Sequence, residues 1–215
     1  MATDDLIDRR EQLRCNLLAW FRSAGRDLPW RSRRSLYGTW ISEIMLQQTT
    51  VAAVVPYWER FLARFPDVKA LAAADEQDVL GLWSGLGYYR RARHLHAAAK
   101  LLVTEAGGRL PADRAGWSAL PGVGAYAAGA IASIGLGERC AALDANARRV
   151  ITRWAVGDQA ELDRLTPARL RDLAESLVPP ADPGEWNEAV MELGAVICRA
   201  RDPRCASCPV AADCR

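Results

Sequence analysis

Four cysteines near the C-terminus follow the spacing C-x6-C-x2-C-x5-C: Cys198, Cys205, Cys208 and Cys214. Four thiolates in one short segment can surround a single sulfur-ligated centre, and such a centre ties the end of the chain into one loop. Zinc also accepts four thiolates, but zinc sites usually consist of two short C-x2-4-C pairs separated by a longer spacer. The uneven gaps and the neighbouring arginines favour a net-negative [4Fe-4S] cluster. Zinc and disulfides remain as alternatives.

Composition and hydropathy indicate a soluble globular protein. Half of the 215 residues are hydrophobic, which is enough for a substantial core. No stretch of about eighteen apolar residues occurs and residues 1–10 are polar, so we expect neither a membrane span nor a signal peptide. The default location is therefore the cytoplasm. Cys15 and Cys140 stand in apolar surroundings and are expected to be buried thiols.

Apolar residues recur every three or four positions along most of the chain, which is the spacing of amphipathic helices. The pattern predicts helices at 6–20 and 41–55. Further helices are expected at about 76–84, 90–105, 125–135, 146–155, 166–178 and 184–199, with Asp182 and Pro183 starting the last of them. Alternation typical of strands is nowhere convincing. The predicted fold class is all-α.

The segment Leu120-Pro-Gly-Val-Gly-Ala-Tyr126 predicts the turn of a helix-hairpin-helix motif. Gly122 and Gly124 can adopt positive φ and bring the turn close to another surface. The free amides at the start of the following helix would then face a DNA phosphate at the positive end of the helix dipole. Contacts of this kind fix position without reading sequence. Taken alone, the pattern is also compatible with a plain turn between two helices.

Two acidic residues have the chemistry that cleavage of a glycosidic bond requires. Asp144 would start a helix, where the dipole and the free amides keep a carboxylate ionised. An isolated aspartate at this position would be an ordinary N-cap. Glu43 has apolar neighbours on both sides, so a semi-buried position would raise its pKa, whereas a solvated helical glutamate is the alternative. Together they would form the acid and the anion that glycosidic cleavage uses.

Several motifs together resemble the MutY-type adenine DNA glycosylases of the helix-hairpin-helix, endonuclease III-like iron-sulfur superfamily. They are S-E-I-M-L-Q-Q-T, G-L-G-Y-Y-x-R-A-R-x-L-H, L-P-G-V-G, L-D-x-N and the cysteine quartet, and they cover nearly all of residues 28–214. The resemblance implies a two-lobed fold. A helical barrel domain with the hairpin would take residues 29–142, and an iron-sulfur cluster domain would take residues 1–28 and 143–215.

The resemblance also implies roles for the catalytic residues. Glu43 would protonate the departing base, and Asp144 would stabilise the oxocarbenium-like sugar. Bifunctional relatives carry a nucleophilic lysine in the second helix of the hairpin, where this chain has Tyr126. A monofunctional enzyme with little or no strand-cleaving lyase activity is therefore expected.

The implied substrate is double-stranded DNA that contains a mismatch or lesion, bound by a nucleoid-associated monomer. Gln48 would enter the duplex beside the flipped nucleotide, and Tyr88 would wedge at the estranged base. Trp30 and Tyr88 are expected in loops bounded by proline or glycine. The substrate-binding residues implied are Leu28, Trp30, Arg31, Gln48, Thr49, Val51, Leu86, Tyr88, Gly122, Gly124, Asn146 and Glu188.

The implied reaction belongs to base excision repair and hydrolyses the N-glycosidic bond of adenine mispaired with guanine or 8-oxoguanine. Adenine leaves readily only when its ring is protonated, so Glu43 favours a purine. Relatives that remove thymine or uracil from G·T or G·U pairs are the alternative. They carry arginines where this chain has Gln47 and Gln48, and an apolar residue where it has Glu188. A silent DNA-binding module is a third possibility that would need no such acids. MutY-type enzymes normally continue into a domain that recognises 8-oxoguanine, and this sequence stops at Arg215, so a weaker preference for 8-oxoguanine is expected.

Overall fold

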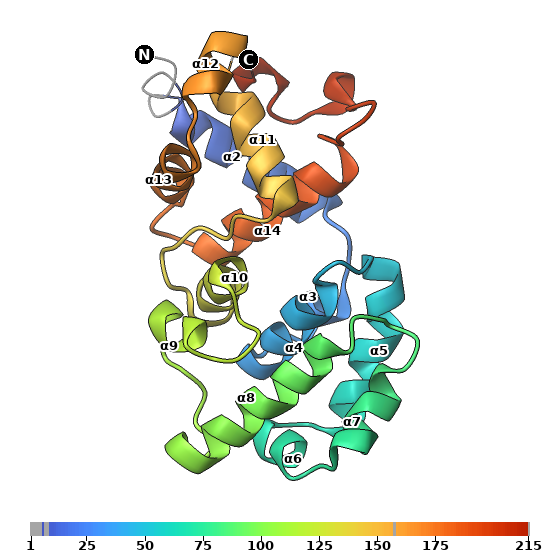
Figure 1. Ribbon diagram of the computed structural model, residues 1–215. Coiled ribbons are helices and arrows are strands. Elements are labelled where there is room, and N and C mark those ends of the chain that lie inside the picture. The colour runs from blue at the N-terminus through green and yellow to red at the C-terminus, as the bar shows by residue number, and fades with distance from the viewer. Residues whose placement is uncertain (1–5, 7–8, 157, 215) are drawn as a thin grey trace. The chain divides into compact units, whose positions relative to one another are not determined.

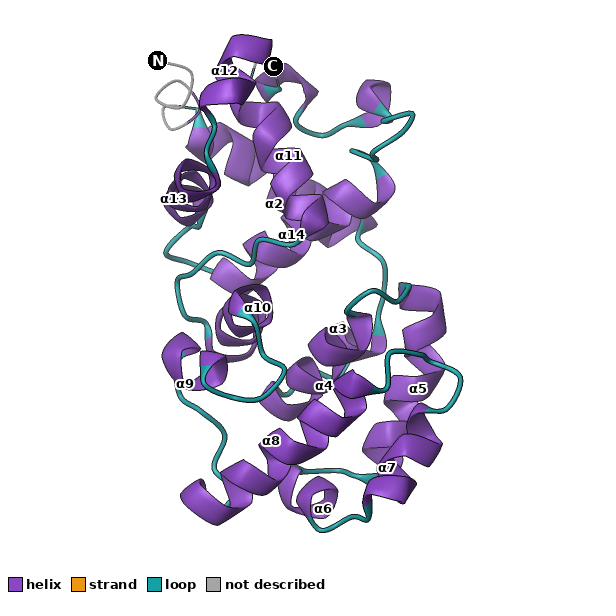
Figure 2. Cartoon of the chain, viewed as in Figure 1, coloured by secondary structure: helices purple, strands orange, loops and turns teal. Residues whose placement is uncertain are grey.

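The computed structural model describes residue 6, residues 9–156 and residues 158–214 (Figure 1). The chain separates into two compact units. Unit 1 takes the described residues of Met1–Arg26 and Gly137–Arg215, and unit 2 is Asp27–Leu136. Figure 2 shows helices, turns and loops but no strand in the described residues, which confirms the all-α prediction. None of the described helices is long and apolar enough to cross a membrane.

Unit 2 is built on a core of large aromatic side chains. Its helices are α3 (Pro29–Ser32), α4 (Leu36–Leu46), α5 (Val51–Arg64), α6 (Val68–Ala72), α7 (Glu76–Trp83), α8 (Arg90–Ala106), α9 (Arg114–Ser118) and α10 (Ala125–Leu136). Helix α4 packs against α5 and α10, and α8 packs against α6 and α7. The fully buried aromatic residues are Trp40, Trp58, Phe61, Phe65, Trp83 and Trp117. Phe61 meets both Phe65 and Trp83 edge to face, a geometry that aromatic rings prefer.

Unit 1 joins the N-terminal helix to the C-terminal third of the chain. Its elements are α2 (Arg10–Ala24), α11 (Ala145–Ala155), α12 (Gln159–Arg164), α13 (Pro167–Leu177), α14 (Pro183–Val196) and the 3-10 turns η1 (Cys205–Ser207) and η2 (Ala211–Asp213). Helix α14 packs against α11 and α2. The buried Arg14 on α2 donates from Nε to the Leu177 carbonyl at 2.8 Å. That bond satisfies a carbonyl at the C-terminal end of α13, where intrahelical partners run out.

Side-chain caps set where several helices begin. The Ser35 hydroxyl accepts a hydrogen bond from the Gly38 amide, and the Thr50 hydroxyl accepts one from the Ala53 amide. Each bond satisfies an amide of the first turn that has no intrahelical acceptor. Asp182 precedes α14 as predicted, but its φ is +52° and its side chain accepts no capping hydrogen bond from the described residues.

Several local predictions are wrong. The single helix predicted at 41–55 is two helices, because α4 ends at Leu46 and α5 begins only after Thr50. The helix predicted at 184–199 ends at Val196. Cys140 is buried as expected, whereas Cys15 is exposed. The helix predicted at 6–20 includes residues 7 and 8, which lie outside the described residues.

Candidate functional site

Unit 2 brings Glu43 and Tyr126 together. Glu43 lies on α4 and is 5% exposed, and Tyr126 is the second residue of α10. Because α4 packs against α10, the Tyr126 hydroxyl reaches the carboxyl group and donates to Glu43 Oε2 at 2.7 Å. A buried carboxyl group that a phenol holds in one orientation is a candidate for a general acid or base. No lysine occupies this position of the hairpin helix.

The residues predicted to line a base pocket in unit 2 are mostly buried. Leu28, Trp30 and Leu86 belong to its hydrophobic core, and Val51 packs against that core. Arg31 is half-buried. The expectation that Trp30 lies in a loop is wrong: it lies in α3 directly after Pro29, and its ring meets that of Trp58 edge to face at 6.0 Å. Contact of these side chains with a base stays a prediction.

Gln48 and Tyr88 lie in two exposed loops of unit 2. Gln48 lies in the loop between α4 and α5, and Tyr88 lies in the loop between α7 and α8. Both have a left-handed backbone, with φ of +57° and +50°, which is uncommon for residues other than glycine. Tyr88 is 58% exposed, although large aromatic side chains are usually covered. Strained backbone and an exposed ring on one loop are typical of a segment that contacts a ligand.

The hairpin turn of unit 2 uses its two glycines differently. Gly122 has a φ of +79°, and a Cβ added there would lie 2.7 Å from His94 Cβ. Gly124 does not have a positive φ, so the expectation of that conformation is wrong for Gly124. A Cβ added at Gly124 would meet no described heavy atom within 4 Å. Gly122 therefore serves the fold of the turn, whereas Gly124 leaves open space beside the first turn of α10.

Asp144 in unit 1 is the N-cap of α11. Its Oδ1 accepts from the Ala147 amide at 2.6 Å, and its Oδ2 accepts from Asn146 Nδ2 at 3.1 Å. Burial raises the pKa of Asp144 above its ordinary value, and these hydrogen bonds offset only part of that rise. The net direction is opposite to the one that capping amides alone would produce, so the Asp144 carboxylate is held partly desolvated.

Arg149 connects the N-cap of α11 to the end of α14. Its guanidinium donates to Asn146 Oδ1 at 2.9 Å, to the Gly194 carbonyl at 2.6 Å and to the Cys198 carbonyl at 2.8 Å. Asn146 in turn bonds to Asp144, so a run of hydrogen bonds joins Asp144 to the backbone of Cys198. Sequence reasoning missed Arg149, because nothing in the local pattern distinguishes this arginine from those on solvated helix faces.

Glu188 lies on α14 and is 4% exposed. The residue before it, Asn187, is held between the Ala142 amide at 3.0 Å and the Cys140 carbonyl at 2.9 Å. These bonds attach the segment that leads to Asp144 onto α14. Sequence reasoning missed Asn187 as well. Glu43 and Tyr126 belong to unit 2 whereas Asp144 and Glu188 belong to unit 1, so the predicted pairing of Glu43 with Asp144 stays a prediction.

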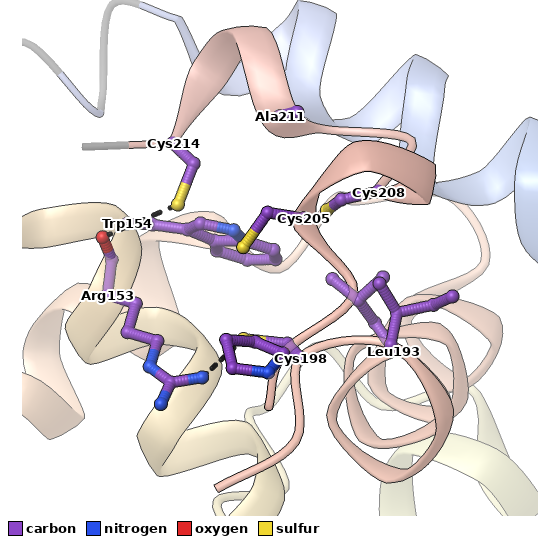
Figure 3. A pocket seen from close by; sticks show the side chains of 10 residues that line it. Arg153, Trp154, Leu193, Cys198, Cys205, Cys208, Ala211 and Cys214 are labelled. Carbon is purple, nitrogen blue, oxygen red and sulfur yellow. Dashed lines mark hydrogen bonds between the residues drawn. The ribbon is translucent and has the colours of Figure 1, made fainter. Parts of the chain in front are cut away.

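The four C-terminal cysteines line one cavity of unit 1, shown in Figure 3. The cavity has a volume of about 470 Å³ and is also lined by Trp154, Leu193 and Ile197. Arg153 donates to Cys198 Sγ at 3.3 Å and to the Arg199 carbonyl at 2.8 Å. No three His, Cys, Asp or Glu side chains of the described residues are close enough together to hold one metal ion. The four thiols therefore line one cavity next to a cation, but they are not gathered at metal-binding distances.

Comparison with known proteins identifies relatives of the chain. Residues 41–176 match the family model of the HhH-GPD superfamily base excision DNA repair proteins. The chain is 44% identical to a mouse protein named adenine DNA glycosylase, over 94% of this chain and 41% of the relative. A protein of the same name from Mycolicibacterium smegmatis is 42% identical, over 90% of this chain and 66% of the relative. The chain therefore spans less than half of the mouse relative.

Solved structures of other proteins share the fold of this chain. A thermostable thymine-DNA glycosylase matches with a TM-score of 0.87 and 30% identity, over 96% of this chain and 95% of that one. A non-covalent complex of endonuclease III with DNA matches with a TM-score of 0.76 and 23% identity, over the same shares of both chains. The second similarity is one of fold alone.

Proposed function

Since the chain belongs to the HhH-GPD superfamily of base excision DNA repair proteins, we propose that it is a monofunctional glycosylase that removes adenine mispaired with guanine or 8-oxoguanine. The observation that carries the proposal is the hydrogen bond of 2.7 Å from the Tyr126 hydroxyl to the buried Glu43. Tyr126 stands at the position where a lyase would carry its lysine nucleophile, and its hydroxyl group orients a buried acid instead. The name adenine DNA glycosylase of the mouse and mycobacterial relatives supports adenine as the base.

The proposed mechanism assigns one step to each acid. Glu43 donates its proton to the ring of the flipped adenine, so that the base leaves as a neutral molecule with the electron pair of the broken bond. The sugar then carries positive charge, which the Asp144 carboxylate stabilises until water adds to it. Partial desolvation of Asp144 makes this attraction stronger than it would be in bulk water. Tyr126 orients the carboxyl group of Glu43.

Removal of thymine from G·T pairs is the second candidate, because a thymine-DNA glycosylase shares the fold over 95% of its length. Thymine can leave as an anion and has less need of an acid, whereas here a buried Glu43 is held in place by a hydroxyl group. Gln48 and Glu188 also favour adenine. We therefore place thymine second.

One excision assay separates these functions. Labelled duplexes containing A·8-oxoG, A·G, T·G or U·G are incubated with excess enzyme, and each is analysed with and without alkali. Breaks at adenine that require alkali are expected, because a monofunctional enzyme leaves an abasic site. Breaks only at thymine or uracil would support the second candidate function and contradict the first. No break in any duplex would favour a silent DNA-binding module.

Double-stranded DNA is the proposed partner, and the hairpin would hold its backbone. The open space beside Gly124 would let a phosphate approach the backbone amides at the start of α10. We propose that the barrel domain at 29–142 and the cluster domain at 1–28 and 143–215 both contribute to this binding, in a cytoplasmic monomer. Affinity should fall steeply with salt, since phosphate contacts release counterions.

Alanine substitutions at the two hairpin glycines should have different effects. Gly122→Ala is expected to lower the melting temperature by roughly 4 °C, because a left-handed alanine costs about 1–2 kcal/mol and its Cβ meets His94. Gly124→Ala should leave the melting temperature unchanged but weaken DNA binding, because its Cβ occupies the open space. Thermal unfolding and fluorescence anisotropy measure the two effects. Equal melting temperatures for both variants would contradict this division of roles.

A [4Fe-4S] cluster is the proposed cofactor, held by Cys198, Cys205, Cys208 and Cys214. The four thiols line one cavity, and their uneven spacing along the chain supports a cluster over a single zinc ion. Arg153 beside Cys198 would offset the negative charge of a thiolate-bound cluster. When bound, the cluster would cross-link the loop between Cys198 and Cys214.

Removal of one thiolate tests the cofactor. Cys208→Ser is expected to lose iron and acid-labile sulfide and to lower the melting temperature, because the loop is no longer tied to its centre. The matched control is Cys15→Ser, which replaces an exposed cysteine outside the cavity. Elemental analysis of the anaerobically purified protein measures the iron, zinc and acid-labile sulfide that each variant contains. Stoichiometric zinc without iron in the unaltered protein would refute the cluster.

A further inference from the structure

Arg91 lies in the first turn of α8 and buries its side chain against the end of α4. Its Nη1 donates to the Ile44 carbonyl at 3.2 Å, to the Met45 carbonyl at 2.6 Å and to the Gln47 carbonyl. Carbonyls in the last turn of a helix have no intrahelical donors. Arg91 supplies these donors from another helix, so its side chain stabilises the C-terminal end of α4.

The same guanidinium also holds both exposed loops of unit 2. Its Nη2 donates to Thr49 Oγ1 at 3.0 Å and to the Gly87 carbonyl at 3.1 Å. Gln48 is thereby bracketed by bonds to the residues on either side of it, and Tyr88 directly follows a bonded carbonyl. The guanidinium carbon also lies 5.3 Å from the centre of the Tyr88 ring.

Gln48 and Tyr88 both need such support. Each has a positive φ, a backbone conformation that residues with a side chain adopt only at an energetic cost. Both are exposed, so packing covers little of either side chain. Strained residues persist only where their surroundings determine the backbone, and Arg91 makes the hydrogen bonds that do so on both loops.

We propose that Arg91 is a positioning residue that holds Gln48 and Tyr88 in a fixed mutual arrangement for insertion into duplex DNA. The inference rests on the proposed function, in which these two side chains enter the duplex. A single planar guanidinium reaches five acceptors on α4 and on both loops, which one lysine ammonium with three donors cannot do. Loops arranged before binding lose less conformational entropy when DNA arrives.

A double-mutant cycle tests the proposal. Arg91→Met and Arg91→Lys are made in the unaltered chain and in a Gln48→Ala/Tyr88→Ala background. The probe is a duplex with a tetrahydrofuran abasic-site analogue opposite guanine, and its dissociation constant is measured by anisotropy. In the unaltered chain, both substitutions should weaken binding by roughly 100-fold, as misplaced contact groups do. In the alanine background the loss should be within about twofold, because nothing remains to be positioned.

Controls separate positioning from charge and from folding. Arg64→Met removes an exposed arginine of unit 2 that contacts neither loop, and it should leave binding unchanged. Thermal unfolding shows whether each Arg91 variant is folded. Equal losses in both backgrounds would overturn the proposal, and so would full binding by Arg91→Lys, which would indicate a direct charge contact with DNA. Failure of both Arg91 variants to fold would also overturn it.

The assay keeps this proposal apart from the proposed function. Whether the unaltered chain excises adenine is measured on that chain alone, before any variant is compared. The cycle itself uses a duplex that cannot be cleaved, so it reports on Arg91 even where the excised base is not adenine. An unaltered chain that binds the abasic duplex no better than an undamaged one would refute the proposed function instead.

Discussion

Glu43→Gln is expected to slow adenine excision by about 1,000-fold while leaving DNA affinity and the melting temperature nearly unchanged. Glutamine keeps the shape of the side chain and can still accept the hydrogen bond from Tyr126, which is 2.7 Å long in the unaltered chain. It has no proton that it can release to the base. Single-turnover excision from an A·G duplex measures the rate, and anisotropy measures binding.

The matched control for this prediction is Glu59→Gln. Glu59 lies on α5 of the same unit, is exposed and pairs with Arg33, so its replacement should not alter excision. Tyr126→Phe should give an intermediate loss, because the acid Glu43 is still present but has lost its orienting partner. A Glu43→Gln enzyme within tenfold of the unaltered rate would rule out Glu43 as the acid.

Asp144→Asn is expected to lower excision by about 100- to 1,000-fold, because the positive charge of the sugar loses its stabilising anion. Asparagine is as good an N-cap as aspartate, so α11 should keep its first turn. The control is Asp158→Asn, since Asp158 caps α12 through the Glu161 amide in the same way and is exposed. Normal excision by Asp144→Asn would refute its role as the anion.

The same substitution should make the protein more stable at neutral pH. Burial raises the pKa of Asp144, so the folded state binds a proton at this carboxyl group more readily than the unfolded state does. This stabilisation is present at low pH and is lost as the pH rises through the folded pKa. Asp144→Asn should therefore raise the melting temperature at pH 7 and have no effect at low pH, where both side chains are neutral. Thermal unfolding across this pH range checks the sign, and a lower melting temperature at pH 7 would contradict it.

Long helices with regular apolar spacing were predicted well from the sequence. Helix α8 was expected at 90–105 and extends over Arg90–Ala106, and α10 was expected at 125–135 and extends over Ala125–Leu136. Helices α3, α6 and α9 were missed because four or five residues are too few for a periodic pattern. The break between α4 and α5 was missed for another reason: the donors that end α4 come from Arg91, more than forty residues further along the chain.

The amino-acid sequence by itself determined the inventory of chemical groups: two acids, a hairpin turn with its glycines, and four thiols in one short segment. These depend on residue type and local spacing, which are read directly from the chain. The tertiary structure alone decided that Tyr126 contacts Glu43, 83 positions away, and that Arg91 holds both exposed loops. It also decided that Asp144 is partly desolvated. Such properties arise where packed helices bring distant side chains together, and no local pattern encodes which of many arginines or tyrosines will be buried there.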